Sequence, residues 1–213
     1  MIFTIANSKG GVGKTSLAAA IAKVWTGYGV ATNETFSLWH EIIDAEERFM
    51  QISPLESFPD FATEQIDVMF DLSGDVTEQS HSIVSAVSQS NVVVVPTIPD
   101  RQAIYATAQY ILTIAPINPN IIVVANQLQK QAKESFNDWS ESYDFKMIQQ
   151  LLNDALGFTP TILPIKQTNA FKAIYKNNQS IPEMMADNKL LEMAYKEAND
   201  QIQAIMNEIQ KYG

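Results

Sequence analysis

Residues 8–15 read Ser-Lys-Gly-Gly-Val-Gly-Lys-Thr, a glycine-rich stretch that ends on a lysine and a threonine. Residues 2–6, directly before it, are mostly apolar and partly β-branched, which is typical of a buried strand. After it, apolar residues recur at helical spacing from Leu17 to Trp25. A strand, a glycine-rich turn and a helix in this order predict a phosphate-binding loop.

The residue types in this stretch suit the binding of nucleotide phosphates. The glycines let successive backbone N–H groups converge on an anion, next to the positive N-terminal end of the helix. Lys14 adds a charge for the β- and γ-phosphates, and the Thr15 hydroxyl is a ligand for Mg²⁺. The predicted binding residues are Gly10, Gly11, Val12, Gly13, Lys14, Thr15 and Ser16.

One detail of the stretch narrows its family. The usual pattern begins with a glycine, whereas this chain has Ser8 at that position and an additional lysine, Lys9, beside it. The string Lys-Gly-Gly-Val-Gly-Lys-Thr resembles the deviant Walker ATPases of the ParA/MinD family. There the first lysine crosses a dimer interface and contacts the phosphates of the partner's nucleotide. The resemblance implies ATP and Mg²⁺ as cofactors, catalytic roles for Lys9 and Lys14, and a nucleotide-dependent homodimer.

The amino-acid composition indicates the class of protein and excludes several kinds of site. With 213 residues, 46% hydrophobic and 18% charged, the chain has enough material for one globular domain, which we expect to span residues 1–213. The absence of cysteine excludes disulfides and thiolate-bound iron–sulfur clusters. The sequence has no continuous apolar window of about 18 residues and enters its first strand at once. We therefore expect neither a transmembrane helix nor a signal peptide, and a cytoplasmic location.

The net charge of −10 bears on the partners of the chain. An acidic chain does not favour broad contact with nucleic acid, so direct DNA contact is possible but unsupported by charge. The C-terminal residues 189–213 predict a helix with one apolar stripe, and they carry more acids than lysines. Because a helix that binds anionic lipid is lysine-rich, we expect this one to pack on the sheet without stable membrane insertion.

Two acids follow a second predicted strand. Residues 66–71 form a mostly apolar run that ends at Asp71. This run resembles the Walker B element, which implies that Asp71 belongs to the Mg²⁺ site with Thr15 and holds a Mg²⁺-bound water. The next residues, 72–75, resemble the switch loop of the nitrogenase iron protein. That likeness implies that Gly74 lets the loop move when the γ-phosphate is lost. It also makes Asp75 a candidate for activating the attacking water.

A third acid has two interpretations. In the family, the second strand ends in an Asp-x-Asp motif whose second acid orients water, but this chain has Phe36 and Leu38 at the expected positions. A similar acidic pair, which begins at Asp44, comes later. Residues 38–52 are read slightly better as an amphipathic helix with Asp44 on its solvent side. Asp44 is thus a second candidate for water activation, and hydrolytic competence depends on these acids.

Further apolar runs complete the predicted sheet. Residues 91–96, 121–127 and 161–164 predict strands, and residues 101–115 and 145–156 predict helices between them. Together they predict an α/β fold, a single P-loop NTPase domain whose mostly parallel central sheet has helices on both faces. The resemblance places Asn126 against the adenine ring and places Pro164 with its neighbours on the other side of it.

The resemblance implies a function as an ATP-dependent dimerisation switch, an ATPase that binds MgATP and hydrolyses it slowly. It also implies a protein partner that stimulates hydrolysis, and a role in plasmid partition or in the stability of a conjugative or mobile element. Three alternatives stay open, one of them a MinD-like membrane oscillator, which would bind liposomes in an ATP-dependent way. The chain is a non-hydrolysing, ATP-bound adaptor protein if no acid activates water. A small metabolic P-loop synthetase would need a second substrate pocket and would leave Lys9 without a purpose.

Overall fold

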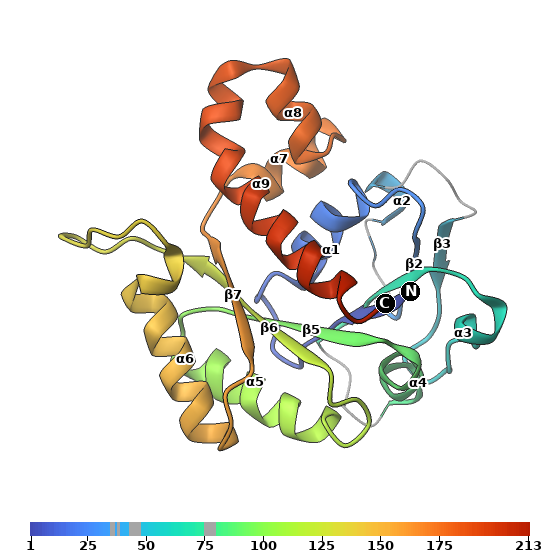
Figure 1. The fold of residues 1–213 in the computed structure, drawn as a ribbon. Coiled ribbons are helices and arrows are strands. Elements are labelled where there is room, and N and C mark those ends of the chain that lie inside the picture. Colours follow the sequence, from blue (N-terminus) through green and yellow to red (C-terminus); the bar gives the residue numbers. More distant parts are fainter. Residues whose placement is uncertain (35–36, 38, 43–47, 75–79) are drawn as a thin grey trace.

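The computed structural model describes residues 1–34, 37, 39–42, 48–74 and 80–213. Within these ranges, seven strands form one sheet: β1 (Ile2–Ile5), β2 (Gly29–Thr32), β3 (Phe49–Gln51), β4 (Val68–Asp71), β5 (Val92–Thr97), β6 (Ile121–Leu128) and β7 (Thr161–Lys166). Their order is β3-β2-β4-β1-β5-β6-β7, and every neighbouring pair is parallel. The predicted parallel α/β sheet is confirmed, with β1 and its glycine-rich loop at the centre (Figure 1).

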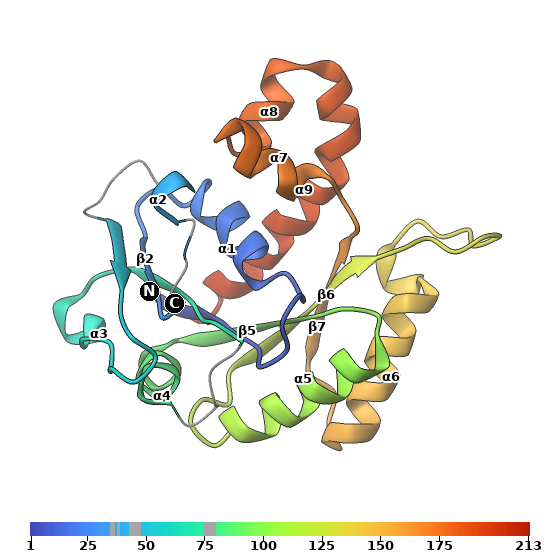
Figure 2. The same cartoon turned by 180° about the vertical axis from the view of Figure 1, so that it is seen from behind.

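Helices cover both faces of the sheet, as Figures 1 and 2 show. One face carries α3 (Phe61–Glu64), α4 (His81–Gln89), α5 (Arg101–Ile114) and α6 (Tyr143–Leu156). The other carries α1 (Lys14–Ala22), α2 (Trp39–Ile42), α7 (Ala170–Asn177), α8 (Ile181–Asp187) and α9 (Lys189–Gln210). The 3₁₀ turn η2 (Trp139–Glu141) precedes α6.

Alternate side chains of each central strand enter two separate cores. In β5, Val92 and Val94 pack with α1 and α9, whereas Val93 and Val95 pack with α4 and α5. All four valines are 0% exposed. A strand that is buried on both faces has no polar alternation, which is why these runs are continuous in the sequence.

The helix expected over residues 38–52 forms only in part. It is confirmed at Trp39–Ile42, which is α2, and it is wrong at Phe49–Gln51, which is the edge strand β3. In that strand Phe49 lies opposite Val30 of β2, and the Ile52 N–H donates to the Thr32 carbonyl at 3.0 Å. Pairing with a neighbouring strand outweighs local preference here. Asp44 lies outside the described residues.

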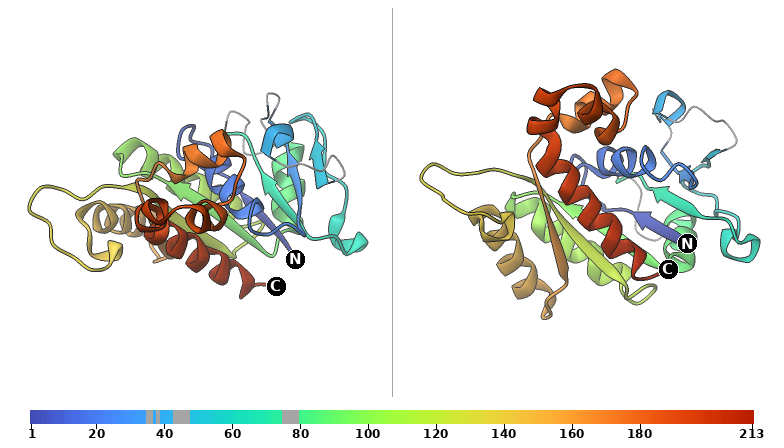
Figure 3. Two further views of the ribbon diagram at one scale, coloured as in Figure 1. Left: turned by 90° about the horizontal axis from the view of Figure 1, so that it is seen from above. Right: turned by 45° about the horizontal axis from the view of Figure 1, so that its top comes forward.

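The second half of α9 packs on the sheet, as the apolar stripe predicts. Its buried residues are Ala198, Ile202, Ile205, Met206 and Ile209. The first half extends beyond the sheet together with α7 and α8, and there Leu190 and Met193 are 75% and 82% exposed (Figure 3). Among the helices of the described ranges, none is both long enough and apolar enough to cross a membrane.

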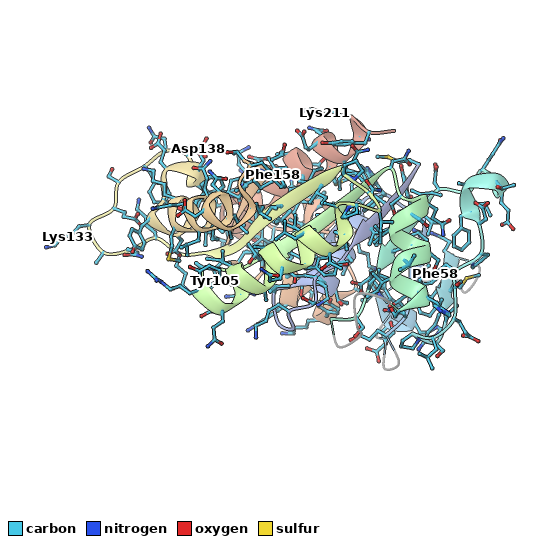
Figure 4. All side chains as sticks on the ribbon, turned by 90° about the horizontal axis from the view of Figure 1, so that it is seen from below. Phe58, Tyr105, Lys133, Asp138, Phe158 and Lys211 are labelled. Atoms are coloured by element: carbon cyan, nitrogen blue, oxygen red, sulfur yellow. The ribbon has the colours of Figure 1, made fainter. Side chains whose placement is uncertain are left out.

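An arm between β6 and η2 projects from the body, with Lys133 at its tip (Figure 4). Its base is tied down by Glu197 of α9. The Trp139 indole Nε1 donates to this carboxylate at 2.8 Å, and the Lys166 ammonium pairs with it at 2.6 Å. One acid thus holds the arm, the end of β7 and α9 together.

Candidate nucleotide site

Strand register brings three loops to one edge of the sheet. Asp71, the last residue of β4, lies opposite Ile5 of β1 on one side and Thr32 of β2 on the other. The segments that follow these strands therefore meet at their carboxyl ends, where parallel α/β sheets bind ligands. A cavity of about 290 Å³ lies there, lined by Gly10, Gly11, Gly13, Lys14, Thr15, Ser16, Glu34, Leu72, Ser73 and Gly74.

The glycine-rich loop has the backbone geometry that a bound phosphate requires. Gly11 and Gly13 have φ angles of 78° and 91°, a region that residues with a side chain rarely adopt. The N-cap of α1 is Gly13, which has no side chain to accept the first N–H groups of the helix. Gly13 and Lys14 both line the cavity, so the N-terminal end of the helix faces it. Lys14 is the first residue of α1, only 9% exposed, and its Nζ donates to the Lys9 carbonyl at 3.2 Å.

Two amides at the end of β6 hold this loop from behind. The Asn126 Nδ2 donates to the Val12 carbonyl at 2.9 Å, and the Gln127 Nε2 donates to the Gly11 carbonyl at 3.4 Å. Asn126 is 1% exposed, and its Nδ2 is occupied by the hydrogen bond to the loop. Its Oδ1 accepts the Gln127 N–H at 2.8 Å, and its contact with an adenine ring stays a prediction.

A second cavity of about 240 Å³ adjoins the loop on its other side. Gly13 and Ser16 line both cavities, and the remaining lining residues here are Asn126, Gln127, Lys166, Gln167, Thr168, Asn169, Phe171 and Lys172. Pro164 is not among them, because it lies within β7, where it pairs with Ala125, and the strand continues to Lys166. The residues that follow Pro164, rather than Pro164 itself, form this wall.

Asp71 is buried, and its two carboxylate oxygens have different surroundings. Its Oδ2 accepts a hydrogen bond from the Trp39 indole at 3.0 Å, whereas its Oδ1 accepts none from the part of the chain that the structure describes. Burial raises the pKa of Asp71 to about 7, against the lowering effect of Trp39 and of the nearby Thr15 hydroxyl. A buried carboxylate oxygen without a partner, beside a threonine hydroxyl, fits a divalent cation.

The surroundings of Asp71 suit Mg²⁺ in particular. Among the described residues, no group of three or more histidine or acidic side chains could hold a metal ion by itself. Mg²⁺ commonly binds through one or two protein oxygens together with phosphate oxygens and waters. Asp71 and Thr15 therefore fit the role that the sequence assigned to them.

Glu34 is an acid of the site that the sequence analysis overlooked. Because β2 ends at Thr32, Glu34 is the second residue after the strand, and it lines the cavity with Lys14 and Thr15. Its charge contributes to the raised pKa of Asp71. Phe36 and Leu38 come later than the end of the strand and lie outside the described residues, as do Asp44 and Asp75.

A buried amide fixes the neighbourhood of Glu34. Asn33 is 0% exposed, its Nδ2 donates to the Ser82 hydroxyl at 2.8 Å, and its Oδ1 accepts the Ser73 N–H at 2.7 Å. The loop after β4 also reaches Lys14, because a Cβ on Gly74 would lie 2.7 Å from the lysine Nζ. The segments after β2 and β4 are thus held against the phosphate lysine.

No protein-family model matches this sequence, and a search of curated proteins finds no match. Solved structures match it over nearly the whole chain. McdA from Cyanothece superposes with a TM-score of 0.65 at 11% identity, covering 98% of each chain. A candidate plasmid partition protein from Borrelia burgdorferi, bound to AMPPNP, gives 0.60 at 14% identity and 98% of each chain. MinD from Aquifex aeolicus gives 0.58 at 16% identity, covering 97% of this chain and 96% of MinD.

The chain has the fold of the ParA/MinD-type P-loop ATPases. The expected resemblance is confirmed at this level, because the likeness spans both the glycine-rich loop and the C-terminal helices. At 11–16% identity it shows the fold alone. It does not assign roles to individual residues of this chain.

The raised pKa of Asp71 predicts a pH-dependent penalty on the stability of the nucleotide-free protein. The group has a pKa of about 7 when folded and about 3.8 otherwise, so the folded state binds its proton more tightly. Its contribution to stability is therefore present at low pH and lost as the pH rises from about 4 to 7. The asparagine of Asp71→Asn does not titrate. From pH 5 to pH 8, the free energy of unfolding of the parent should therefore fall relative to that of Asp71→Asn by on the order of 2 kcal/mol.

Denaturant unfolding in EDTA at pH 5, 6, 7 and 8 measures this difference between parent and variant. The comparison cancels the titration of all other groups, which both proteins share. Parallel pH profiles for the two proteins would contradict the prediction, because they would show that Asp71 is ionised throughout.

Proposed function

We propose that this chain is an ATP-dependent dimerisation switch of the ParA type, in which one domain spanning residues 1–213 binds MgATP and hydrolyses it slowly. The position of Lys9 carries the proposal. The Lys9 N–H donates to the Asn7 Oδ1 at 3.0 Å, and the Lys9 carbonyl accepts the Lys14 ammonium at 3.2 Å. Among the residues with described positions, no acid forms an ion pair with the Lys9 ammonium. A second lysine is thus fixed by its backbone at the loop while its charge is available to a partner's phosphates.

The support of Lys9 reaches deep into the sheet. Asn7 is 1% exposed, and its Nδ2 donates both to the Pro96 carbonyl and to the Thr107 hydroxyl, each at 2.8 Å. The loop therefore starts from a backbone that is anchored to β5 and α5. Such anchoring reduces the conformational freedom that Lys9 would lose on reaching across an interface.

The two adjoining cavities divide the proposed nucleotide between them. Lys14 and the N-terminus of α1 face the cavity that suits the phosphates, and the cavity lined by Gln127 and Gln167 suits the nucleoside. Thr15 and Asp71 would hold Mg²⁺, which neutralises phosphate charge when it is bound. The Borrelia burgdorferi protein of this fold binds AMPPNP, an ATP analogue, which supports ATP as the ligand.

Hydrolysis needs an acid that orients water toward the γ-phosphate, and Glu34 is the described residue placed for it. It shares its cavity with Lys14 and Thr15, and it is adjacent to Asn33, which bonds the loop after β4. Loss of the γ-phosphate would change the surroundings of that loop and of Lys9 together.

The resemblance to the ParA/MinD family also leads us to propose a protein partner that stimulates hydrolysis, and a plasmid or another mobile element as cargo. We propose that the protein acts in the cytoplasm without stable membrane insertion.

Molar mass by light scattering tests the switch. We expect 23.7 kDa without nucleotide and with ADP–Mg²⁺, and about twice that mass with ATP–Mg²⁺. Lys9→Ala should bind ATP and remain a monomer, because only the charge that reaches the partner is lost. Lys211→Ala is the matched control, since it removes the same charge from an exposed site at the far end of α9.

Two results would count against the proposal. A mass that is indifferent to nucleotide in the parent would favour an enzyme that acts on small molecules. A Lys9→Ala protein that still doubles its mass with ATP would show that the second lysine does not serve the dimer.

A further inference from the structure

Trp39 is the largest fully buried side chain of the described residues, and it belongs to a helix of four residues at the nucleotide site. It is 0% exposed, although α2 lies in a segment whose other residues are largely polar. The Ser37 hydroxyl accepts the N–H of Trp39, the first residue of this helix, at 3.1 Å. The Trp39 indole Nε1 donates a hydrogen bond to the Oδ2 of Asp71 at 3.0 Å. Nothing in the proposed function requires a tryptophan here.

The indole leaves Asp71 with one oxygen for other ligands. Oδ2 is occupied by the indole, and Oδ1 is buried without a hydrogen bond from any residue that the structure describes. The backbone of Asp71 is also fixed, because its carbonyl accepts the Thr32 hydroxyl at 2.6 Å. A carboxylate that is held by its backbone and by one oxygen presents its second oxygen in a defined direction.

The same hydrogen bond joins two segments that both serve the site. Trp39 follows Glu34 after the end of β2, whereas Asp71 ends β4. The segment that carries the water-orienting acid is thereby attached to the acid that would hold the cation. Groups that hydrogen-bond a metal ligand fix its orientation and tune its affinity for the metal.

We propose that Trp39 is a positioning residue for the divalent cation, because its indole N–H holds one oxygen of Asp71 and directs the other toward the metal. This inference rests on the proposed MgATP site and adds to it a residue that touches neither nucleotide nor metal. A purely structural role for the indole would affect nucleotide binding equally with and without the cation. The positioning role affects only the part of the affinity that Mg²⁺ supplies.

The test measures the affinity of a fluorescent ATP analogue in Mg²⁺ and in EDTA, for the parent and for Trp39→Phe. We expect Trp39→Phe to reduce the gain in affinity from Mg²⁺ by about tenfold and to leave the affinity in EDTA unchanged. Trp139→Phe is the matched control, because it removes an indole hydrogen bond to a carboxylate, that of Glu197, and neither residue lines the cavity around Lys14 and Thr15. It should behave as the parent does.

Asp71→Asn provides a second comparison. Trp39→Phe should have no further effect on the Mg²⁺ gain once Asp71 is replaced, because the indole acts only through that carboxylate. If Trp39→Phe loses nucleotide affinity equally in EDTA and in Mg²⁺, or loses none, the proposal is overturned while the nucleotide site itself stands. A parent that binds nucleotide no better with Mg²⁺ would overturn the proposal and the proposed cation site together.

A protein with Trp39 as its only tryptophan gives a readout that does not depend on the stability of Trp39→Phe. In a Trp25→Phe, Trp139→Phe variant, we expect Trp39 emission to change when Mg²⁺ is added to the nucleotide complex. The change should disappear when Asp71→Asn is added. Emission that is indifferent to Mg²⁺ in the variant that retains Asp71 would contradict the proposal.

Discussion

Glu34→Gln should reduce ATP turnover by about 10²- to 10³-fold while leaving ATP affinity nearly unchanged. The carboxylate lines the same cavity as Lys14 and Thr15, and no other acid among the described residues lines that cavity. The glutamine has the same shape but cannot accept a proton from water. Steady-state phosphate release measures the turnover, and a fluorescent nucleotide measures the affinity. Because hydrolysis would reset the switch, the ATP-bound dimer should also persist longer in this variant.

Glu41→Gln is the control for this experiment, because Glu41 lies in α2 and is exposed to solvent. It removes the same charge from the same stretch of chain and should retain parental turnover. Asp44→Asn and Asp75→Asn complete the set, since both acids were predicted from the sequence to activate water. If one of them abolishes turnover and Glu34→Gln does not, the assignment of Glu34 is wrong. A parent without any turnover would instead favour the non-hydrolysing adaptor.

The sequence predicted those parts of the fold whose signals are local. The phosphate loop is defined by adjacent residues, and the strands around β5 are continuous apolar runs because both of their faces are buried. The carboxylate at the end of β4 could be found for the same reason, since the apolar run stops at Asp71. Each of these features is complete within one short segment.

The features that the sequence missed depend on contacts between distant segments. The edge strand β3 has three residues and exists through its pairing with β2. Glu34 was overlooked because β2 is also short and ends at Thr32. A polar pair that follows a four-residue strand was the available signal. The bond from Trp39 to Asp71 joins residues 32 positions apart and has no local signature.

Asn126 makes a hydrogen bond that its position in the sequence does not reveal, and its contact with an adenine ring stays a prediction. The end of β6 was predicted to face the nucleotide, and it does adjoin the cavity beside the loop. The amide is 1% exposed and bonds the Val12 carbonyl, so it shapes the loop that would bind phosphate. A resemblance transfers the position of a side chain more securely than its hydrogen-bond partner, because the partner depends on every neighbouring residue.

Gly13→Ala should destabilise the protein by about 2–4 kcal/mol and weaken ATP binding by about tenfold or more. Gly13 has a φ of 91°, which is strained for any residue with a Cβ, and that Cβ would lie 2.3 Å from the Asn126 Nδ2. The amide would have to move, and its buried hydrogen bond to the Val12 carbonyl would break. Both the loop backbone and the start of α1 would then shift away from the geometry that suits a phosphate.

Denaturant unfolding without nucleotide separates this effect from binding. Gly10→Ala is the control in the same loop, because a Cβ there meets no atom within 4 Å, and its stability should stay within about 0.5 kcal/mol of the parent. Asn126→Ala should cost less in the Gly13→Ala background than alone, because the two changes break the same hydrogen bond. Equal stabilities for Gly13→Ala and Gly10→Ala would show that the loop tolerates a side chain at Gly13. In that case Asn126 would not fix the loop in the geometry on which the proposed nucleotide site depends.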